Sequence, residues 1–344
     1  MQVTFRWYGP DDPVQLSQIR QIPAVRGLVS ALYDIPVGEV WPRATIQALV
    51  KTAREAGLPL AVVESLPVHE DIKLGRSTRD RHLDNYRKSL RNLGAEGVRT
   101  VCYNFMPLFD WLRTRLDAPL PDGSRSLAYD QSEVDRMDPR RLSLPGWDPS
   151  YADEAVDDLL GAFRELSAED LWAHFAYFLK AVAPAAEEAG VRLAIHPDDP
   201  PWPVFGVPRI VSSEAALARL LDIYPRPTNG LCLCVGSLGE SPENDVAEIV
   251  RRFVGAGRVH FLHLRNIAHT GPQAFQETGH MEGALDLAEV VGLLAAAGYD
   301  GPVRPDHGRS IWGEGGRAGY GLYDRALGAM YLKGVWDGVV RPRR

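Results

Sequence analysis

The sequence has little cysteine: three residues in a chain of 344, at Cys102, Cys232 and Cys234. Three thiols at these spacings cannot build the disulfide framework that stabilises small secreted proteins. A single residue separates Cys232 from Cys234, which is not the C-x-x-C spacing of a thioredoxin-type redox pair. We therefore expect a protein of a reducing compartment, and place it in the cytoplasm.

Long apolar runs and clusters of basic residues are also missing. No uninterrupted apolar stretch approaches the roughly 18 residues that a membrane span requires. The first residues, MQVTFRWYGPDD, have neither the basic nor the apolar region of a signal peptide. The formal net charge is −7, with no basic run, which argues against a nucleic-acid groove. We expect neither a membrane nor a nucleic acid as a partner.

One stretch, residues 303–324 (VRPDHGRSIWGEGGRAGYGLYD), concentrates polar chemistry. It offers a carboxylate, an imidazole, guanidinium groups and a phenol, which supply directional hydrogen bonds and protons to a charged or polyhydroxylated small molecule. Its glycines allow the segment to fold over a site as a loop. A polar, glycine-rich surface loop without function is the alternative. The glycine spacing misses the G-x-G-x-x-G pattern of a dinucleotide site.

Short apolar segments alternate with helical patterns along most of the chain. This alternation is typical of a parallel sheet, and eight strands close a (β/α)8 TIM barrel. We predict one TIM-barrel catalytic domain over residues 1–344. The eight predicted strands are Val3–Trp7, Gly27–Leu32, Leu60–Val63, Thr100–Asn104, Arg192–His196, Gly230–Cys234, Arg258–His263 and Val303–Asp306.

The alternation breaks after the fourth strand. Residues from about 106 to 167 are rich in Pro, Asp and Arg, with the turn clusters PLPDGS and LPGWDPSY. We predict a long, partly helical insertion here that forms part of the site wall or an oligomer contact.

The last four predicted strands each end in a residue that can bind a metal: His196, Cys234, His263 and Asp306. The carboxyl ends of barrel strands ring the active site, and adjacent strands lie about 4.8 Å apart, so these four side chains can converge on one ion. Two imidazoles, a thiolate and a carboxylate suit Fe(II), Zn or Mn(II) better than Mg. A lone histidine at a strand end is more often a scaffold residue, but four ligand types in phase favour a metal site. Cys232 is assigned to the core.

Further polar residues on the same rim are candidates for binding substrate. Arg265 follows His263 by two residues, and its guanidinium can clamp a carboxylate; an ion pair with a rim acid is the alternative. Asp198 and Asp199 either support the ligands or cap the next helix. The other candidate substrate-binding residues are His69, Asn104 and Trp312.

Several further motifs stand out along the chain: TFRWYGPDDPV, SALYDIPVGEVWP, PVHEDIKLG, VCYNFMPLFDW, LAYDQ, AIHPDDPPWPVFG, HLRN, RPDHGRSIWGE and GYGLYDRALGA. Together they resemble the mannonate dehydratase family, a xylose-isomerase-like TIM-barrel group of hexuronate catabolism. The resemblance covers nearly the whole chain, with departures at Val235, where the family commonly has Thr, and at Ser310, where it usually has Met.

The resemblance implies a metal-dependent hydro-lyase that converts D-mannonate to 2-keto-3-deoxy-D-gluconate and water, with Mn²⁺ or Fe²⁺ as cofactor. The family's metal ligands fall on the same four residues proposed above, and its acid/base residues fall on His307 and Tyr320. Which of the two is the base stays open. We expect a small sugar acid as partner and a homo-oligomer, either a dimer or a tetramer. A metal-dependent sugar or sugar-acid isomerase and a non-catalytic sugar-acid binding protein are the alternatives.

Overall fold

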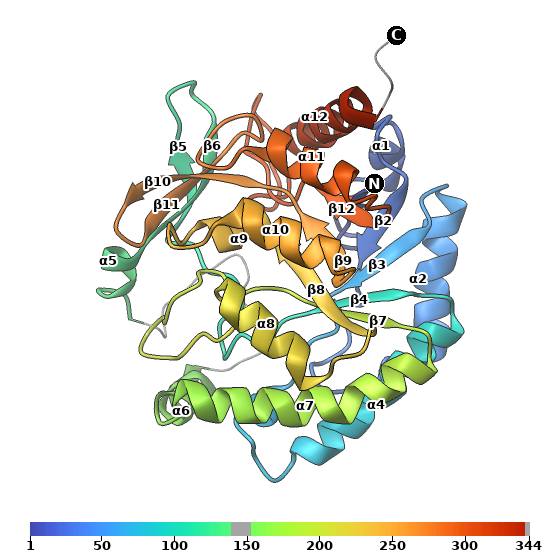
Figure 1. The fold of residues 1–344 in the computed structure, drawn as a ribbon, viewed down its shortest axis with the longest axis vertical. Coiled ribbons are helices and arrows are strands. Elements are labelled where there is room, and N and C mark those ends of the chain that lie inside the picture. Colours follow the sequence, from blue (N-terminus) through green and yellow to red (C-terminus); the bar gives the residue numbers. More distant parts are fainter. Residues whose placement is uncertain (139–152, 341–344) are drawn as a thin grey trace.

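Eight parallel strands form a closed barrel in the structure, a computed structural model that describes residues 1–138 and 153–340 (Figure 1). Around the barrel the strands follow the order β1-β12-β9-β8-β7-β4-β3-β2. Each coincides with a strand predicted from the sequence, so the TIM-barrel prediction is confirmed. The barrel strands are β1 (Gln2–Arg6), β2 (Gly27–Ser30), β3 (Leu60–Glu64), β4 (Thr100–Tyr103), β7 (Arg192–Ile195), β8 (Asn229–Cys234), β9 (Val259–His263) and β12 (Pro302–Arg304).

Helices cover the outside of the barrel (Figure 1). In α10 the apolar residues Val246, Ile249, Val250 and Phe253 recur at helical spacing and are buried, whereas the arginines between them are exposed. The longer helices are α2 (Arg43–Glu55), α4 (Arg79–Ala95), α6 (Asp153–Arg164), α7 (Ala168–Glu188), α8 (Glu214–Ile223), α10 (Val246–Gly255), α11 (Leu287–Ala296) and α12 (Tyr323–Val340). The short helices, of about one turn, are α1 (Leu16–Arg20), α3 (Glu70–Lys73), α5 (Gln131–Val134) and α9 (Val235–Gly239). None of the helices in the described part of the chain is long and apolar enough to cross a membrane.

Alternate residues of the strands pack on opposite sides of the barrel wall. One set packs in the barrel interior as a small apolar cluster of Val29, Val62, Cys102, Ala194, Cys232 and Phe261. The residues between them, such as Val63, Val101 and Leu231, belong to the large core under the helices. Residues two apart in a strand point to the same side, so the residues two positions after Val62, Ala194, Cys232 and Phe261 also face the barrel interior. These residues are Glu64, His196, Cys234 and His263. The strand pattern therefore places a polar layer directly above an apolar floor.

A second, antiparallel sheet of order β10-β11-β6-β5 lies at one side of the barrel (Figure 1). The insertion supplies β5 (Arg115–Pro119) and β6 (Arg125–Asp130), and the segment after β9 supplies β10 (Asn266–Gly271) and β11 (Ala274–Thr278). The insertion was predicted as partly helical, and it does contain α5 and α6, but neither hairpin was predicted. The turn cluster at residues 144–151 lies outside the described residues.

An apolar cluster joins the second sheet to the barrel. It contains Phe109 and Tyr129 from the insertion, Trp202 from the segment after β7, and Ile267 and Phe275 from the later hairpin. Burying each large side chain contributes about 1.5–3 kcal/mol, so this cluster holds the insertion firmly over the strand ends. The second sheet thereby becomes a wall of the region above the barrel.

Candidate active site

The carboxyl ends of the barrel strands surround a cavity of about 460 Å³. Its wall carries guanidinium groups, carboxylates, imidazoles and phenols, which suit a polar, anionic small molecule. The ionisable and hydroxyl-bearing side chains at the wall include Arg6, Tyr8, Tyr33, Glu64, Asp110, His196, Arg304, Asp306, His307, Arg317 and Tyr320.

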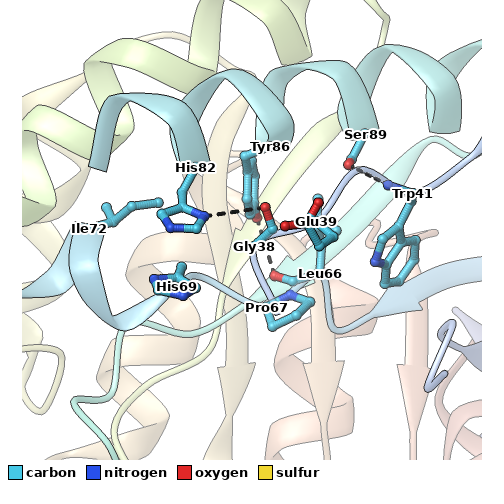
Figure 2. A pocket seen from close by; sticks show the side chains of 10 residues that line it. All are labelled: Gly38, Glu39, Trp41, Leu66, Pro67, His69, Ile72, His82, Tyr86 and Ser89. Atoms are coloured by element: carbon cyan, nitrogen blue, oxygen red, sulfur yellow. Dashed lines mark hydrogen bonds between the residues drawn. The ribbon is translucent and has the colours of Figure 1, made fainter. Parts of the chain in front are cut away.

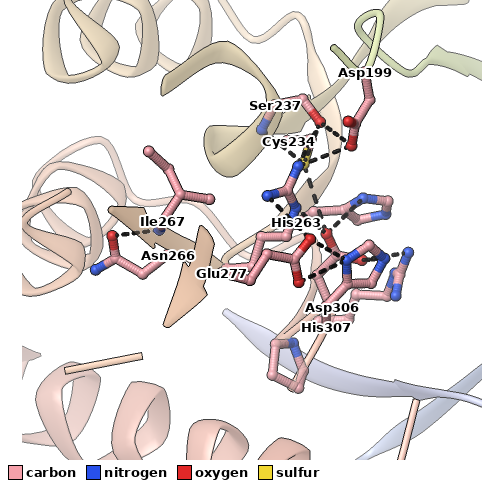
Figure 3. Close-up of polar contacts among 12 residues, drawn as sticks. Asp199, Cys234, Ser237, His263, Asn266, Ile267, Glu277, Asp306 and His307 are labelled. Atoms are coloured by element: carbon pink, nitrogen blue, oxygen red, sulfur yellow. Dashed lines mark hydrogen bonds and ion pairs between the residues drawn. The ribbon is translucent and has the colours of Figure 1, made fainter. Parts of the chain in front are cut away.

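The four predicted metal ligands lie close together beside this cavity. The ligand atoms of His196, Cys234 and His263 lie within 4.8 Å of one another. Asp306 Oδ2 joins them, at 3.6 Å from Cys234 Sγ and 3.8 Å from His263 Nδ1 (Figure 3). The structure thus brings together two imidazole nitrogens, one sulfur and one carboxylate oxygen from four neighbouring strands.

Outer contacts of the two histidines determine which ring nitrogens can bind a cation. His196 Nδ1 lies 2.6 Å from the Pro197 carbonyl oxygen, and because a carbonyl only accepts, Nδ1 carries the proton. On His263, Nε2 faces Glu64 Oε1 at 3.4 Å. The facing nitrogens, His196 Nε2 and His263 Nδ1, lie 3.1 Å apart. With the outer nitrogens protonated, both inner nitrogens present lone pairs to one point, so the donor set fits a metal ion.

Glu64 is a buried carboxylate that orients His263. Arg6 Nη1 and Arg304 Nη2 each lie 2.9 Å from its Oε1. Burial alone would raise the pKa of Glu64, but the Arg304 and Arg6 guanidinium groups hold it well below its usual range. An ionised carboxylate against the outer nitrogen of a ligand histidine increases the basicity of the inner nitrogen.

Ser237 contacts the sulfur of Cys234 with two of its groups. The backbone N–H donates to Sγ over 3.4 Å. The hydroxyl lies 3.1 Å from Sγ and 3.0 Å from Asp199 Oδ2, and its one proton can be donated to only one of them at a time. Asp199 therefore lies behind the cysteine and is linked to it through the Ser237 hydroxyl. Asp198 instead accepts from the N–H groups of Ile210 and Val211 and supports a loop, not a ligand.

Asp306 is held by two guanidinium groups. Arg304 Nη2 lies 2.8 Å from Oδ1 and Arg265 Nε lies 3.2 Å from Oδ2. Burial would raise the pKa of Asp306, but Arg304, together with the nearby histidines, keeps it well below its usual range. The residue adopts a φ of 65°, a conformation that costs energy in a non-glycine residue and is common at functional sites. Next to it, His280 Nε2 donates to the Pro305 carbonyl over 2.7 Å, which helps to hold this backbone.

His307 and Tyr320, the predicted acid/base pair, are hydrogen-bonded to each other. His307 Nε2 lies 3.0 Å from the Tyr320 hydroxyl, and both side chains line the cavity. The other ring nitrogen, Nδ1, lies 2.9 and 3.0 Å from the two carboxylate oxygens of Glu277 (Figure 3). Burial raises the pKa of Tyr320 despite the opposing Arg304 charge, so its phenol stays protonated. Glu277, His307 and Tyr320 therefore form a continuous chain of hydrogen bonds from β11 to the cavity.

A network of buried charges lies behind these residues. Arg113 and Arg265, 0% and 1% exposed as side chains, lie among Asp199, Glu240 and Glu277. Burial would raise the pKa of Asp199, but Arg113 and Arg265 lower it strongly. For Glu240, burial and the Asp199 charge raise the pKa well above its usual range, which favours its neutral form. This network ties the second sheet to the metal-ligand cluster.

The predicted substrate-binding residues are placed differently from one another. Asn104 lines the cavity and its amide donates to Asp110 over 2.9 Å. Arg265 does not line the cavity, because the strand ends at His263 and the arginine side chain points toward the buried charges. It forms ion pairs with Asp199 and Glu240, as the alternative interpretation expected. Trp312 is 74% exposed and packs against the Tyr323 ring, away from the cavity. Direct substrate contact by Arg265 or Trp312 therefore has no support from the cavity lining.

His69 lies in a separate shallow hollow, where its ring stacks on that of His82 (Figure 2). The ring centroids are 3.7 Å apart and the planes differ by 9°. Burial and the neighbouring His82 lower the pKa of His69 to about 4. Asp71 lies near both rings, at 3.7 and 3.8 Å, but parallel imidazoles direct their lone pairs side by side, not at a common point. This group therefore lacks the geometry of a metal site, and His69 does not line the central cavity.

Glu64, Arg317 and Glu277 are among the residues of the site that were not predicted from the sequence. Glu64 follows the predicted strand Leu60–Val63 and begins the polar cluster ESLPVHED, so its position in phase with Val62 was a usable signal. Arg317 belongs to the glycine-rich stretch but had no assigned role. Glu277 lies in a hairpin that was not recognised, although the Gly271–Pro272 dipeptide marks its turn.

Comparisons with known proteins identify the family to which this chain is similar. The family model described as D-mannonate dehydratase (UxuA) matches residues 1–344. The chain is 52% identical to mannonate dehydratase 2 of Halalkalibacterium halodurans over 343 residues, covering 98% of this chain and 99% of the relative. The crystal structure of a mannonate dehydratase from Streptococcus suis serotype 2 superposes with a TM-score of 0.94 at 47% identity, covering 99% and 95% of the two chains. A D-psicose 3-epimerase from Clostridium cellulolyticum H10 shares the fold alone, with a TM-score of 0.58 at 12% identity, over 99% and 100% of the chains.

Proposed function

Because the chain belongs to the D-mannonate dehydratase family, we infer that the cavity at the strand ends is the site where D-mannonate loses water. The family assignment establishes the activity predicted from the sequence: a hydro-lyase of hexuronate catabolism that forms 2-keto-3-deoxy-D-gluconate. The isomerase alternative is not favoured, since the epimerase resembles this chain in fold only. The observation that carries the proposal is the His307–Tyr320 pair facing the same cavity as the ligand cluster.

We assign His196, Cys234, His263 and Asp306 as the ligands of one divalent ion, Mn²⁺ or Fe²⁺. The mixed nitrogen, sulfur and oxygen set suits these ions, and the facing lone pairs of the two histidines support the assignment. When bound, the ion supplies Lewis acidity to the substrate oxygens beside C2.

His307 and Tyr320 carry the two proton transfers of the reaction. Dehydration requires removal of the proton on C2 and protonation of the hydroxyl that leaves C3. Trp111 packs on the His307 ring with centroids 4.6 Å apart, and Tyr8 packs on the Tyr320 ring at 4.9 Å. These aromatic contacts hold the pair in place and limit the access of water to it.

Arg317 is the cation that we propose for the substrate carboxylate. It lines the cavity and is exposed, with its guanidinium 4.3 Å from the centre of the Tyr8 ring. Within residues 1–138 and 153–340, no ion pair engages it, whereas Arg6 and Arg304 are committed to Glu64. A guanidinium without a protein partner is available for bidentate binding of a carboxylate.

Replacing Arg317 with Gln is expected to raise KM for D-mannonate about 10- to 100-fold, with metal content unchanged. The estimate follows from the loss of one charge-assisted hydrogen bond, about 1.5–3 kcal/mol. Steady-state kinetics measures it, with Arg251→Gln as the matched control, because Arg251 is an exposed arginine on α10 paired with Glu248. An unchanged KM would remove Arg317 from the carboxylate site.

A turnover screen tests the proposed function itself. Chelated protein is supplied with Mn²⁺ or Fe²⁺ and offered D-mannonate, other hexonates and the neutral sugar mannose, with 2-keto-3-deoxy acid as the measured product. We expect product from D-mannonate only in the presence of metal, and none from mannose. Conversion of mannose at a comparable rate, or isomerisation of the sugar acid without loss of water, would contradict the proposal.

We further propose that the protein is a cytoplasmic homo-oligomer. Its three cysteines are all free and buried, which suits a reducing compartment.

The support for an oligomer is an exposed apolar surface on α12. Tyr323, Leu327 and Met330 share one face of this helix and are 43%, 47% and 43% exposed. Light scattering should give at least a dimer, and Leu327→Asp should shift it toward the monomer because a charge would be buried in the contact. A monomeric unmodified protein would refute the oligomer.

A further inference from the structure

His307 has a different partner on each ring nitrogen. Nδ1 faces the Glu277 carboxylate at 2.9 and 3.0 Å, and Nε2 faces the Tyr320 hydroxyl at 3.0 Å. The imidazole is 5% exposed and Glu277 is 4% exposed, so water does not replace either contact. The direction of both hydrogen bonds therefore depends on the charge state of Glu277.

Glu277 is held as a carboxylate by the insertion. Arg113, which is fully buried, donates to Glu277 Oε1 from Nε over 3.0 Å and from Nη2 over 2.7 Å. Burial would raise the pKa of Glu277, but His307, Arg113 and Arg265 lower it to about 2. An ionised carboxylate has no proton to donate, so the hydrogen bond to His307 must come from Nδ1–H.

We propose that Glu277 is a positioning residue that keeps a proton on His307 Nδ1, and thereby makes His307 the base and Tyr320 the acid. With Nδ1 protonated, the lone pair is on Nε2, which faces the cavity, and the Tyr320 hydroxyl donates to it. A tyrosine that donates and a histidine that accepts have their roles set before substrate arrives. This inference rests on the proposed function and adds the residue that decides the direction of proton transfer.

The resulting cycle is balanced in protons and electrons. As the Tyr320 hydroxyl turns to the C3 hydroxyl of the substrate, His307 Nε2 accepts the C2 proton. The electron pair of the C2–H bond becomes the C2–C3 double bond, and the C3–O bond breaks with its own pair. The leaving hydroxide takes the Tyr320 proton and departs as water. The phenolate then regains a proton from His307 Nε2–H across the 3.0 Å contact, and both residues return to their starting state. The enol product rearranges to the ketone.

The proposal gives the second sheet a specific task. Glu277 comes from β11 and contacts His307, and Arg113 comes from the segment that leads into β5 and contacts Glu277, so both lie outside the barrel strands. The barrel alone would place His307 beside Asp306 without fixing its tautomer. Two ion pairs, Arg113–Glu277 and Glu277–His307, thus connect the insertion to the His307–Tyr320 pair.

Glu277→Gln tests the proposal. Arg113 would retain the amide oxygen at the Oε1 position, 2.9 Å from His307 Nδ1, and the amide N–H2 would take the Oε2 position, 3.0 Å from the same nitrogen. The negative charge that holds the proton on Nδ1 is lost, and a donor now competes for Nδ1, so the preference for the Nδ1–H tautomer weakens. We expect kcat for D-mannonate to fall on the order of 10²–10⁴-fold, as when a triad carboxylate is replaced by its amide. KM and bound metal should stay within about twofold, and Glu277→Asp, which keeps the charge, should recover part of kcat.

A double-variant measurement separates this role from a structural one. Because Glu277 acts through His307, adding Glu277→Gln to His307→Asn should leave the residual kcat unchanged. A further drop in the double variant, or a Glu277→Gln kcat within threefold of the unmodified enzyme, would overturn the proposal. Failure of the unmodified enzyme to dehydrate D-mannonate would instead refute the proposed function. If Glu277→Gln does not fold, Glu277→Ala takes its place, alone and combined with His307→Asn, and is judged by the same two criteria.

Discussion

Cys234→Ser is expected to lower bound metal well below one ion per chain and to abolish turnover of D-mannonate. A serine hydroxyl is a much weaker ligand than a cysteine sulfur for the ions that a mixed nitrogen, sulfur and oxygen set binds. His263→Ala should have the same effect, since it removes the nitrogen that lies 3.1 Å from His196 Nε2. Metal analysis of the purified protein, together with kinetics at saturating Mn²⁺, measures both results.

Cys232→Ser is the matched control for this prediction. Cys232 lies two residues earlier on the same strand and packs against the apolar floor of the barrel with Cys102 and Phe261. The same chemical change at this position should leave metal content near one ion per chain. Full metal occupancy in the Cys234 variant, or equal loss in both variants, would exclude Cys234 as a ligand.

The second large effect is expected at the acid/base pair. His307→Asn and Tyr320→Phe should each lower kcat by roughly 10²–10⁴-fold, the usual contribution of one acid or base group, while metal and fold are retained. Asparagine cannot accept and release a proton at neutral pH, and phenylalanine removes the hydroxyl that lies 3.0 Å from His307 Nε2. Steady-state kinetics at saturating metal measures the loss, and thermal unfolding checks the fold.

Tyr8→Phe provides a control for the aromatic surroundings. Its ring packs on Tyr320 edge to face with centroids 4.9 Å apart, and phenylalanine preserves that contact. We expect a much smaller change in kcat than for Tyr320→Phe. A near-normal kcat in either His307→Asn or Tyr320→Phe would show that the residue is neither the acid nor the base.

Much of the barrel and its ligand cluster was predictable because the determining patterns are local. Eight short apolar strands alternate with helices, and a closed barrel brings their carboxyl ends together. Residues two apart share a face, so their order along the strand separates Cys232, in the core, from Cys234, at the ligand cluster. The same rule failed for Arg265, because the strand ends at His263 and the chain no longer alternates beyond it.

The sequence by itself determined the barrel, the family of the enzyme and the four candidate ligands at successive strand ends. Only the tertiary structure decided which charged groups reach the cavity and which are consumed in the buried network. Arg113 and Glu277 are 164 residues apart, and Glu277 and His307 are 30 apart. Glu277 lies in the second sheet, whereas His307 follows a strand of the barrel. No periodicity in the sequence links such residues, since their contact depends on how two hairpins pair and pack over the barrel. The candidates for proton transfer are therefore local information, whereas the contacts that we propose to set its direction are a property of the assembled fold.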